Sequence, residues 1–496
     1  MQHELELKEV SVSLYKYMCE KLVGSANVVR YRRLYCKLND EIFDDSSSAI
    51  ISSGSKAEGL DLPGSDYDIM FLVKSWLVYE TKPSDDEDVI VLDTDNALPG
   101  FALLKVSDNT AFPCPITVTA NGNYIANVDW LQFILGKEYD ILCFIHGPSL
   151  SNSLLDDTDL VVCFKCHTWP TIAKNWLLRY RSSEWPSQDV IYNVVDHGVL
   201  VVPVGSKSPS SDGNPLEWRF SFSLSEKLLV CSFNHCQLLC YSLLKIFLKQ
   251  ILNKDKVLQN KLCSYHMKTV LFWILEEVEN LNWIPENLLH CFLVCIRRLH
   301  YWILSGYVPN YFIPEHNMID GKLGDTVVSY LSLFLENMNS CGNWWKIIVS
   351  APSLSDFRRT PISISKHLER LSEFDGAVLL IQSLSTFTML LSDNTAESLC
   401  SSLLYMMCHK SLPYTVKKII LIMFLQWNKT ILSSVDTLSG NTKCLYLRHK
   451  ECLSRILMNT FHETVSWWLL IAGFFTLHRS TTKCLTFYNY RLVCCC

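Results

Sequence analysis

The chain has 496 residues, of which 49% are hydrophobic and 19% are charged, and its formal net charge is −6. This length allows two or three domains with substantial cores, and the apolar fraction excludes a disordered protein. The acidic balance argues against polyanion binding over the whole surface, although local basic patches can still bind nucleic acid. The 21 scattered cysteines are odd in number, which favours reduced thiols in the cytoplasm over a disulfide framework.

The N-terminal segment MQHELELKEVSVSLYKYM lacks the apolar centre of a signal peptide. No apolar run approaches the roughly 20 residues that a membrane helix needs. We therefore expect neither secretion nor a membrane span.

In chain order, residues 5–40 are expected to form one helix that carries the basic stretch RYRRLYCK. Short apolar runs then predict strands at 69–73, 89–93, 102–106, 116–120, 159–164, 199–205 and 216–223. Helical pieces with Trp-Pro starts are expected between residues 169 and 198. From Leu224 onward the apolar spacing is helical, in segments at 226–233, 236–252, 264–279 and 286–306. The predicted fold class is α+β, with a mixed sheet in the first half and helices in the second.

The stretch GSKAEGLDLPGSDYDIMFLV, residues 54–73, joins a Gly-Ser turn to an apolar strand with two aspartates. Alternation along a strand makes Asp66 and Asp68 face the same way, where their charges repel unless a cation neutralises them. Such oxygen ligands suit Mg²⁺ or Mn²⁺ bound together with substrate phosphates. Gly54 allows close backbone approach to a phosphate, and Ser55 can donate to its oxygens. The alternative is an ordinary edge strand with one solvated face.

Two metal ions for nucleotidyl transfer normally need a third carboxylate from a neighbouring strand. The best candidate is Asp159, which comes just before an apolar strand, and Asp156 and Asp157 are its rivals. The alternative for this stretch is a solvated acidic strand start.

Seven stretches of the chain together resemble the cyclic GMP-AMP synthase and male-abnormal-twenty-one-like nucleotidyltransferases. They are GSKAEG, SDYDIM, DLVVCFKCHTWP, LEWRFSFSLSEKLL, LLKIFL, SYHMKT and NYFIPEHN, in order over about residues 50–325. The resemblance implies a two-lobed fold, with a nucleotidyltransferase core at 1–235 and a helical lobe like helix-hairpin-helix modules at 236–330. Residues 331–496 would then be a helical extension of unknown role.

The resemblance also implies an activity, namely template-independent joining of ATP and GTP into a cyclic or linear dinucleotide messenger for innate immunity. The enzyme would use Mg²⁺ or Mn²⁺ and act in the cytoplasm, and a second copy of the chain would be a partner. The alternative is a catalytically silent family member that binds nucleotides or other proteins.

Site roles follow from the same resemblance. Asp66, Asp68 and Asp159 would hold two metal ions, and Gly54 and Ser55 would contact the donor triphosphate. Lys245 would bind phosphate, and Tyr265 would stack on a base with Ser264 beside it. Three further residues would contact the nucleotides, namely Arg219, Ser221 and Glu226. Each has a simpler alternative. Lys245 alone reads as a surface lysine beside an apolar helix face, Tyr265 as a core aromatic, and Arg219 as one half of a structural ion pair near Glu217.

Vertebrate DNA-sensing relatives carry a zinc-binding ribbon that is missing here. The corresponding stretch has Cys231, His235, Cys236 and Cys240 without an insertion, and their close spacing favours buried thiols over zinc. Double-stranded DNA is therefore not expected as a ligand, and resemblance to the zinc-free invertebrate receptors of this family implies double-stranded RNA if a basic stripe of the chain senses nucleic acid. Arg30 and Arg33 share a helix face and could line its backbone, unless this face is merely solvated.

Overall fold

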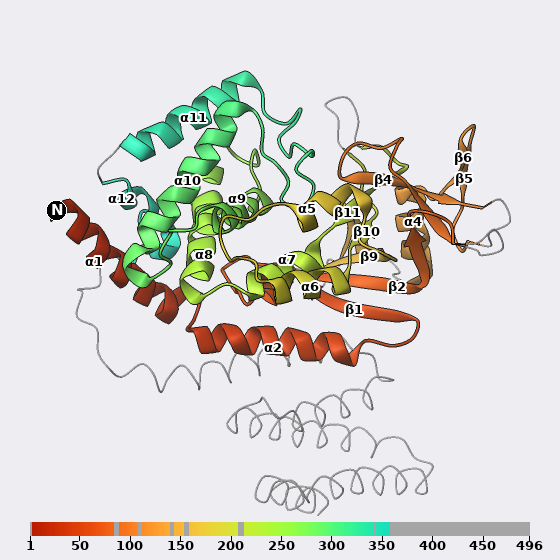
Figure 1. The fold of residues 1–496 in the computed structure, drawn as a ribbon, viewed down its shortest axis with the longest axis horizontal. Coiled ribbons are helices and arrows are strands. Elements are labelled where there is room, and N and C mark those ends of the chain that lie inside the picture. The colour runs from red at the N-terminus through yellow and green to blue at the C-terminus, as the bar shows by residue number, and fades with distance from the viewer. Residues whose placement is uncertain are drawn as a thin grey trace, which may run out of the picture. The chain divides into compact units, whose positions relative to one another are not determined.

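The computed structural model describes residues 2–357, apart from 84–88, 108–111, 139–142, 153–157, 207–212 and 341–342 (Figure 1). The chain divides into two compact units, Met1–Lys366 and His367–Cys496, and the described residues all lie in the first. Most of the predicted extension at 331–496 is therefore outside the described residues. The rival aspartates at 156 and 157 also lie outside them.

The N-terminal segment forms two helices where one was expected. Helix α1 spans Gln2–Tyr17 and continues as the short π-helix η1, Met18–Leu22, and helix α2 spans Ala26–Ile42. The break is at Gly24, whose φ of +97° is left-handed and unsuited to a helix. Ser25 then caps α2 by accepting a hydrogen bond from the Val28 N–H at 3.4 Å.

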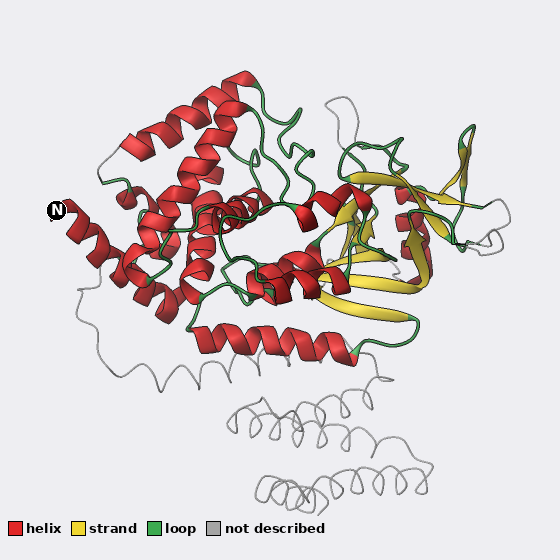
Figure 2. Cartoon of the chain, in the orientation of Figure 1, coloured by secondary structure: helices red, strands yellow, loops and turns green. Residues whose placement is uncertain are grey.

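Eleven strands form one mixed sheet in the described chain (Figure 2). They are β1 Ser48–Ser53, β2 Tyr67–Tyr79, β3 Ile90–Asp93, β4 Phe101–Val106, β5 Thr117–Thr119, β6 Gly122–Tyr124, β7 Cys143–His146, β8 Ser149–Asn152, β9 Thr158–Cys166, β10 Leu200–Val202 and β11 Glu217–Ser221. Each predicted strand region contains a strand. The short strands β1, β6, β7 and β8 were not predicted, because they lack a clear apolar alternation.

The sheet order is β1-β2-β3-β4-β11-β10-β9-β8-β7, and an additional β2–β9 pairing closes a ring of strands from β2 round to β9. Strand β2 is parallel to both β9 and β3, whereas the other pairings are antiparallel. Strand β2 pairs with three strands, namely β1 along its first half, β3 at its end and β9 on both sides of a register shift between Leu72 and Leu77.

Helices surround the sheet and form a separate lobe beside it (Figure 1). Those near the sheet are α3 Gly54–Ala57, α4 Asn127–Glu138, α5 Lys174–Leu178, α6 Gln188–His197 and α7 Ser223–Cys231. The helical lobe contains α8 His235–Gln250, α9 Ser264–Glu277, α10 Leu288–Ser305, α11 Asp325–Ser340 and α12 Trp345–Ile348. Short 3-10 turns lie at Thr171–Ala173, Leu252–Lys254, Pro285–Asn287 and Pro352–Leu354. The mixed α+β, two-lobed prediction is confirmed, and α11 runs across the predicted boundary at residue 330.

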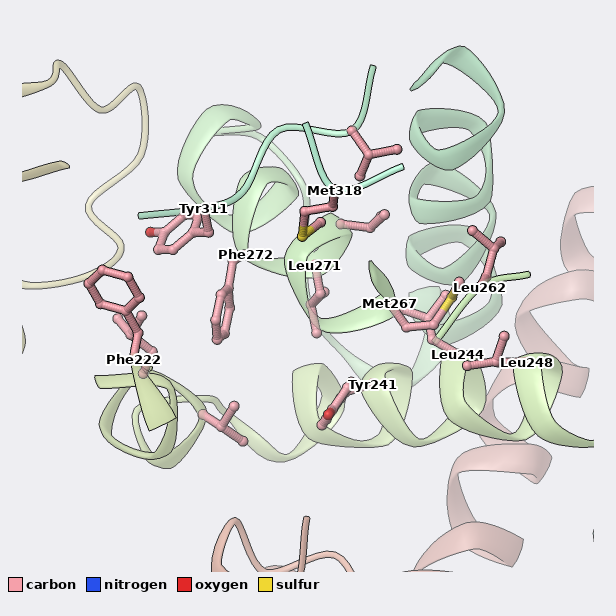
Figure 3. Packing of buried hydrophobic residues seen from close by; sticks show 14 of the residues in the cluster. Phe222, Tyr241, Leu244, Leu248, Leu262, Met267, Leu271, Phe272, Tyr311 and Met318 are labelled. Carbon is pink, nitrogen blue, oxygen red and sulfur yellow. The ribbon is translucent and has the colours of Figure 1, made fainter. Parts of the chain in front are cut away.

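The two lobes share one apolar core (Figure 3). Phe222, where the sheet passes into α7, stacks on Phe312 with ring centroids 4.3 Å apart. Tyr241 from α8 and Phe272 from α9 belong to the same buried cluster. Continuous packing of this kind fixes the helical lobe against the sheet, so side chains from both can meet at one site.

One helix in the described chain, Pro285–Ser305, is long and apolar enough to cross a membrane by length and composition alone. It includes α10, whose side chains Phe292, Ile296 and Ile303 are buried in the shared core. The expectation that no apolar run is of spanning length was therefore wrong for this helix. Its burial is what a core helix shows, and a single such helix is weak evidence for a span.

Candidate functional site

Two of the predicted metal-binding aspartates lie side by side. Asp68 in β2 is the direct register partner of Asp159 in the parallel strand β9, and of Ser53 in the antiparallel strand β1. The Ser53 hydroxyl donates to the Asp68 carbonyl at 3.2 Å, which holds the end of β1 against this position. Asp66 comes just before β2 and is exposed. Strand pairing therefore brings carboxylates from distant parts of the sequence to one point of the sheet.

The negative charge of Asp68 is only partly compensated by nearby cations. Burial, followed by the neighbouring charges of Asp159 and Asp66, raises the pKa of Asp68 to about 6, and Lys268 opposes the rise only in part. A group with its pKa so raised holds its negative charge at a cost in free energy at neutral pH. A divalent cation between the carboxylates would remove that cost.

Gly54 makes room for the Asp68 carboxylate. Its φ is +67°, and a Cβ atom built at this position would lie 1.7 Å from Asp68 Oδ2. No other residue type can occupy this position without moving the carboxylate. The turn that was expected to approach a phosphate thus first accommodates a carboxylate, and it continues as the one-turn helix α3 with the half-buried Ser55 in it.

We expect Gly54→Ala to abolish divalent-cation binding, because the new methyl group must displace the Asp68 carboxylate. Gly321→Ala is the matched control, since Gly321 has a φ of +64° and no atom within 4 Å of its added Cβ. Both variants should lose about 1–2 kcal/mol of stability from backbone strain. Calorimetric titration with Mn²⁺ should show at least about a tenfold loss of affinity for Gly54→Ala only. Equal affinities in the two variants would contradict the role of Asp68.

The donor chemistry of the three aspartates fits a divalent cation, since all their ligating atoms are carboxylate oxygens. Within the described ranges, however, no three His, Cys, Asp or Glu side chains are gathered as a metal centre requires. For an ion to bind here, the side chains of Asp66 and Asp159 would have to turn toward Asp68.

Lys245 is buried in α8, with only 5% of its surface exposed, so its interpretation as a surface lysine was wrong. Burial lowers the pKa of Lys245 to about 8, and Glu58 and Asp68 oppose the shift while Lys268 adds to it. A buried ammonium near the carboxylates is a ready partner for a phosphate, whose negative charge would restore its pKa.

A buried ion cluster lies next to Asp68 and was not predicted. Lys268 in α9 donates to Glu58 at 2.6 Å and to Glu226 at 2.8 Å, and Glu58 Oε2 has no hydrogen-bond partner in the described structure. The cluster ties the turn after α3 to α7 and α9, that is, one lobe to the other. Glu226, expected to contact a nucleotide, is thus already paired. The sequence signal that could have indicated the cluster is a lysine within the apolar helix HMKTVLFW.

The N-terminus of α9 presents the predicted base-stacking residues. Ser264 is exposed. Tyr265 is half-buried, packs against the main core and accepts a hydrogen bond from Asn310 on its hydroxyl at 3.2 Å, which is the arrangement of the alternative, a core aromatic with its hydroxyl at the rim. Arg219 in β11 is exposed, and its guanidinium lies close enough to interact electrostatically with Tyr265. Ser221, at the end of the same strand, is half-buried.

The alternative ion pair of Arg219 with Glu217 is not formed. Glu217 is buried, and its carboxylate accepts hydrogen bonds from the backbone N–H groups of Leu98 and Ser206. The Arg219 guanidinium has no hydrogen-bond or ion-pair partner among the described residues, so it is available to a ligand.

The short cysteine-rich stretch around α8 contains both buried and exposed thiols. Cys236 and Cys240 are buried, Cys231 is exposed, and His235 contacts the Cys19 thiol at 3.3 Å. Burial lowers the pKa of His235 to about 4, so the imidazole is neutral. Burial of the thiols, as the spacing predicts, holds for Cys236 and Cys240 and is wrong for Cys231.

Arg33 belongs to the fold and not to a free basic stripe. Its guanidinium donates to the backbone carbonyls of Glu58, Cys231 and Val230 at 2.8, 3.2 and 3.1 Å. Arg30 is exposed, as are Lys254 and Lys256 beyond α8. The expected stripe of Arg30 and Arg33 was therefore wrong in its second member.

Comparison with known proteins identifies the two lobes. The model of the Mab-21 protein nucleotidyltransferase domain matches residues 156–231, and that of the Mab-21 protein HhH/H2TH-like domain matches residues 236–332. These two matches cover 173 of the 496 residues and show what this part of the chain is similar to. This agrees with the resemblance of the sequence motifs to that family, and with a sheet that carries carboxylates beside a helical lobe. The matched residues include Asp159, Arg219, Glu226, Lys245 and Tyr265.

Three relatives show how far the similarity of this chain extends. The chain is 28% identical over 177 residues to the cyclic GMP-AMP synthase of Mus musculus, which is 32% of this chain and 33% of that protein. It is 25% identical over 228 residues to a cyclic GMP-AMP synthase-like receptor of Tribolium castaneum, which is 45% of this chain and 47% of that protein. It is 24% identical over 178 residues to protein mab-21-like 3 of Danio rerio, which is 34% of this chain and 41% of that protein. The similarity thus spans between a third and a half of these relatives.

Proposed function

We propose that the protein is a nucleotidyltransferase that joins ATP and GTP, or a similar pair of nucleotides, into a cyclic or linear dinucleotide. The observation that carries the proposal is the register pairing of Asp68 with Asp159, beside Asp66, with the pKa of Asp68 raised to about 6 by burial and by these neighbours. A purely structural sheet gains nothing from pairing Asp68 with Asp159 in register, close to Asp66. A phosphoryl-transfer site does, because they bind the cations that neutralise a triphosphate.

Asp66, Asp68 and Asp159 would hold Mg²⁺ or Mn²⁺. When bound, the ions stabilise charge on the transferring phosphoryl group. The protein's own part is to position these carboxylates. Gly54 leaves the space in which the Asp68 carboxylate lies, and strand pairing fixes the Cα positions of Asp68 and Asp159.

The remaining residues would bind and orient the nucleotides. The Ser55 hydroxyl and Lys245 ammonium would contact the triphosphate of the donor, the first from the motif turn and the second from α8. The Arg219 guanidinium and the Tyr265 ring would hold a base, with Ser264, Ser221 and Glu226 at the same face. Glu226 would have to exchange its ion pair with Lys268 for a nucleotide contact. The domain limits that we propose for this arrangement are 1–235 for the core, 236–330 for the helical lobe and 331–496 for the extension.

The proposal is tested by incubating the purified full chain with radiolabelled ATP, GTP, CTP and UTP and with Mg²⁺ or Mn²⁺. We expect a dinucleotide product that requires the divalent ion and is lost in Asp159→Asn. Binding of nucleotide without any product would instead identify a silent, nucleotide-binding family member. An active Asp159→Asn protein would show that another carboxylate completes the site.

We further propose that the enzyme is a cytoplasmic innate-immune sensor, acts as a homodimer and is triggered by double-stranded RNA read through its shape and phosphates. Support comes from the exposed cations Arg30, Lys254 and Lys256, and from the missing zinc ribbon. The same assay with added nucleic acid tests this, since RNA and not DNA should stimulate the product at low salt and lose its effect as salt rises. Equal stimulation by DNA would overturn the choice of ligand.

A further inference from the structure

Two cysteines in the described part of the chain are exposed, Cys231 and Cys263. Their surroundings shift the pKa of the thiol differently, and the thiol pKa controls reactivity. Burial of the thiol raises the pKa of Cys231, and the nearby Arg33 only partly offsets this. Cys263 has a histidine beside it and lies at the N-terminus of a long helix, α9. The pair therefore offers a reactive thiol and an internal reference in the same molecule.

Cys263 and His266 form a reciprocal cap on α9. The Cys263 Sγ accepts a hydrogen bond from the His266 N–H, and the Cys263 N–H donates to His266 Nδ1 at 2.9 Å. Sγ and Nδ1 are themselves 3.1 Å apart, which is within reach for proton exchange. This geometry matches a capping box in which thiol and imidazole replace the usual hydroxyl and carboxylate or amide.

The imidazole is an unusual choice for a cap. His266 is 5% exposed, and its Nε2 atom is buried without a hydrogen-bond partner among the described residues. A glutamine at this position would complete the same cap without burying an unpaired ring nitrogen. The histidine therefore has a chemical capability that capping does not need, namely that it can take the thiol proton.

The charges around the thiol favour its ionised form. Burial acts to raise the pKa of Cys263, but the hydrogen bond and charge of His266, with the N–H groups of His266 and Tyr265, outweigh it and lower the pKa to about 7. The other groups that face the thiol are Arg219 from β11 and Tyr241 from α8. A thiolate at a helix N-terminus beside a histidine is the environment in which cysteines react.

We propose that Cys263 is a modification site, a nucleophilic thiol that His266 activates and that hydroperoxides oxidise. His266 Nδ1 gives up the hydrogen bond from the Cys263 N–H and takes the proton from Sγ, and the thiolate attacks one peroxide oxygen. The S–O bond forms as the O–O bond breaks, and the leaving hydroxide takes the proton back as water. Sulfur is oxidised to a sulfenic acid and the peroxide is reduced. A thiol in the chain or in solution can then reduce the product.

Oxidation would act on the proposed nucleotide site, and this part of the inference rests on the proposed function. Cys263 directly precedes Ser264 and Tyr265, which we assign to the nucleotide base. An added oxygen on sulfur breaks the cap of α9 and adds bulk at that edge. Oxidised protein should therefore bind nucleotide more weakly, and bound nucleotide should shield the thiol.

The test measures thiol reactivity by mass spectrometry of the full chain, with hydrogen peroxide and with iodoacetamide as probes. At pH 7, Cys263 should react more than about fivefold faster than Cys231, because the gain in thiolate outweighs the lower nucleophilicity of a more acidic thiol. The His266→Gln variant keeps the capping box and should slow Cys263 to the rate of Cys231. The Cys263→Ser variant keeps a good cap and should lose the labelled site but not its basal properties.

Three results would overturn the inference. They are equal rates for the two cysteines, an unchanged rate in His266→Gln, and a rate for Cys263 that still rises in proportion to hydroxide well above pH 7. The link to nucleotide binding is measured separately, as the decrease in the labelling rate of Cys263 when ATP and Mg²⁺ are present. A fast thiol without protection would retain the modification site and reject its link to nucleotide binding, whereas a slow thiol with normal dinucleotide synthesis would reject the site alone.

Discussion

Asp68→Asn should abolish nucleotidyl transfer and at the same time stabilise the protein at neutral pH. The side chain keeps its shape, but the charge that a cation needs is removed. Loss of one metal-binding carboxylate removes several kcal/mol of transition-state stabilisation, so product should fall by at least about a thousandfold. The variant should be more stable for the same reason. Without a bound cation, the buried negative charge of Asp68 lowers the free energy of unfolding.

The sign of the pH effect follows from the direction of the shift. The pKa of Asp68 is raised from 3.8 to about 6 on folding, so its contribution to stability is fully present below pH 4 and is lost as the pH rises through 6. At pH 8 the wild-type protein carries an unfavourable charge that the variant lacks. Chemical denaturation should then show the variant more stable by about 1–3 kcal/mol, with the difference shrinking toward pH 5.

Saturating Mg²⁺ provides the control, since it should stabilise the wild-type protein and leave Asp68→Asn unchanged. A variant that is less stable at pH 8 would show that the Asp68 charge is satisfied by the protein itself. Turnover at the wild-type rate would remove the carboxylate from the mechanism altogether.

The predicted part of the site was the part encoded locally. The alternation in SDYDIM and the acidic start of DLVVCF each place a carboxylate relative to its own strand, and both strands were predicted at these positions. That Asp68 and Asp159 are register partners is a fact of strand pairing. Spacing along the chain cannot supply it, because one residue of slip would turn either side chain away.

The unpredicted part depends on residues far apart in the sequence. Lys268 reads as one polar position on an apolar helix, and only the tertiary fold brings it to two carboxylates, Glu58 after α3 and Glu226 in α7. Arg33 likewise appears to be a surface cation until the fold brings three carbonyl groups to it. Ion pairs and hydrogen bonds between residues far apart in the sequence depend on tertiary packing. Local sequence patterns therefore predict the helices but not the contacts that their side chains make.

Lys268→Met should destabilise the protein by about 3–5 kcal/mol, the cost of leaving buried charges without their partner. Lys268 is 10% exposed in its side chain, Glu58 is 2% exposed, and Glu226 is 13% exposed, so water cannot replace the lost ammonium. Methionine has a similar length and fills the space, which limits any cavity contribution. Urea denaturation at pH 7 without nucleotide or metal measures the effect.

Two further variants separate the ion cluster from general damage to α9. Arg298→Ala removes the more exposed ion pair of Arg298 with Glu277 and should cost less than about 1 kcal/mol. Adding Glu58→Gln to Lys268→Met removes the more deeply buried orphan charge, so the double variant should regain about 1–3 kcal/mol over Lys268→Met alone. If the double variant is no more stable than Lys268→Met, the loss comes from packing, and the charge of Lys268 does not hold the two lobes together.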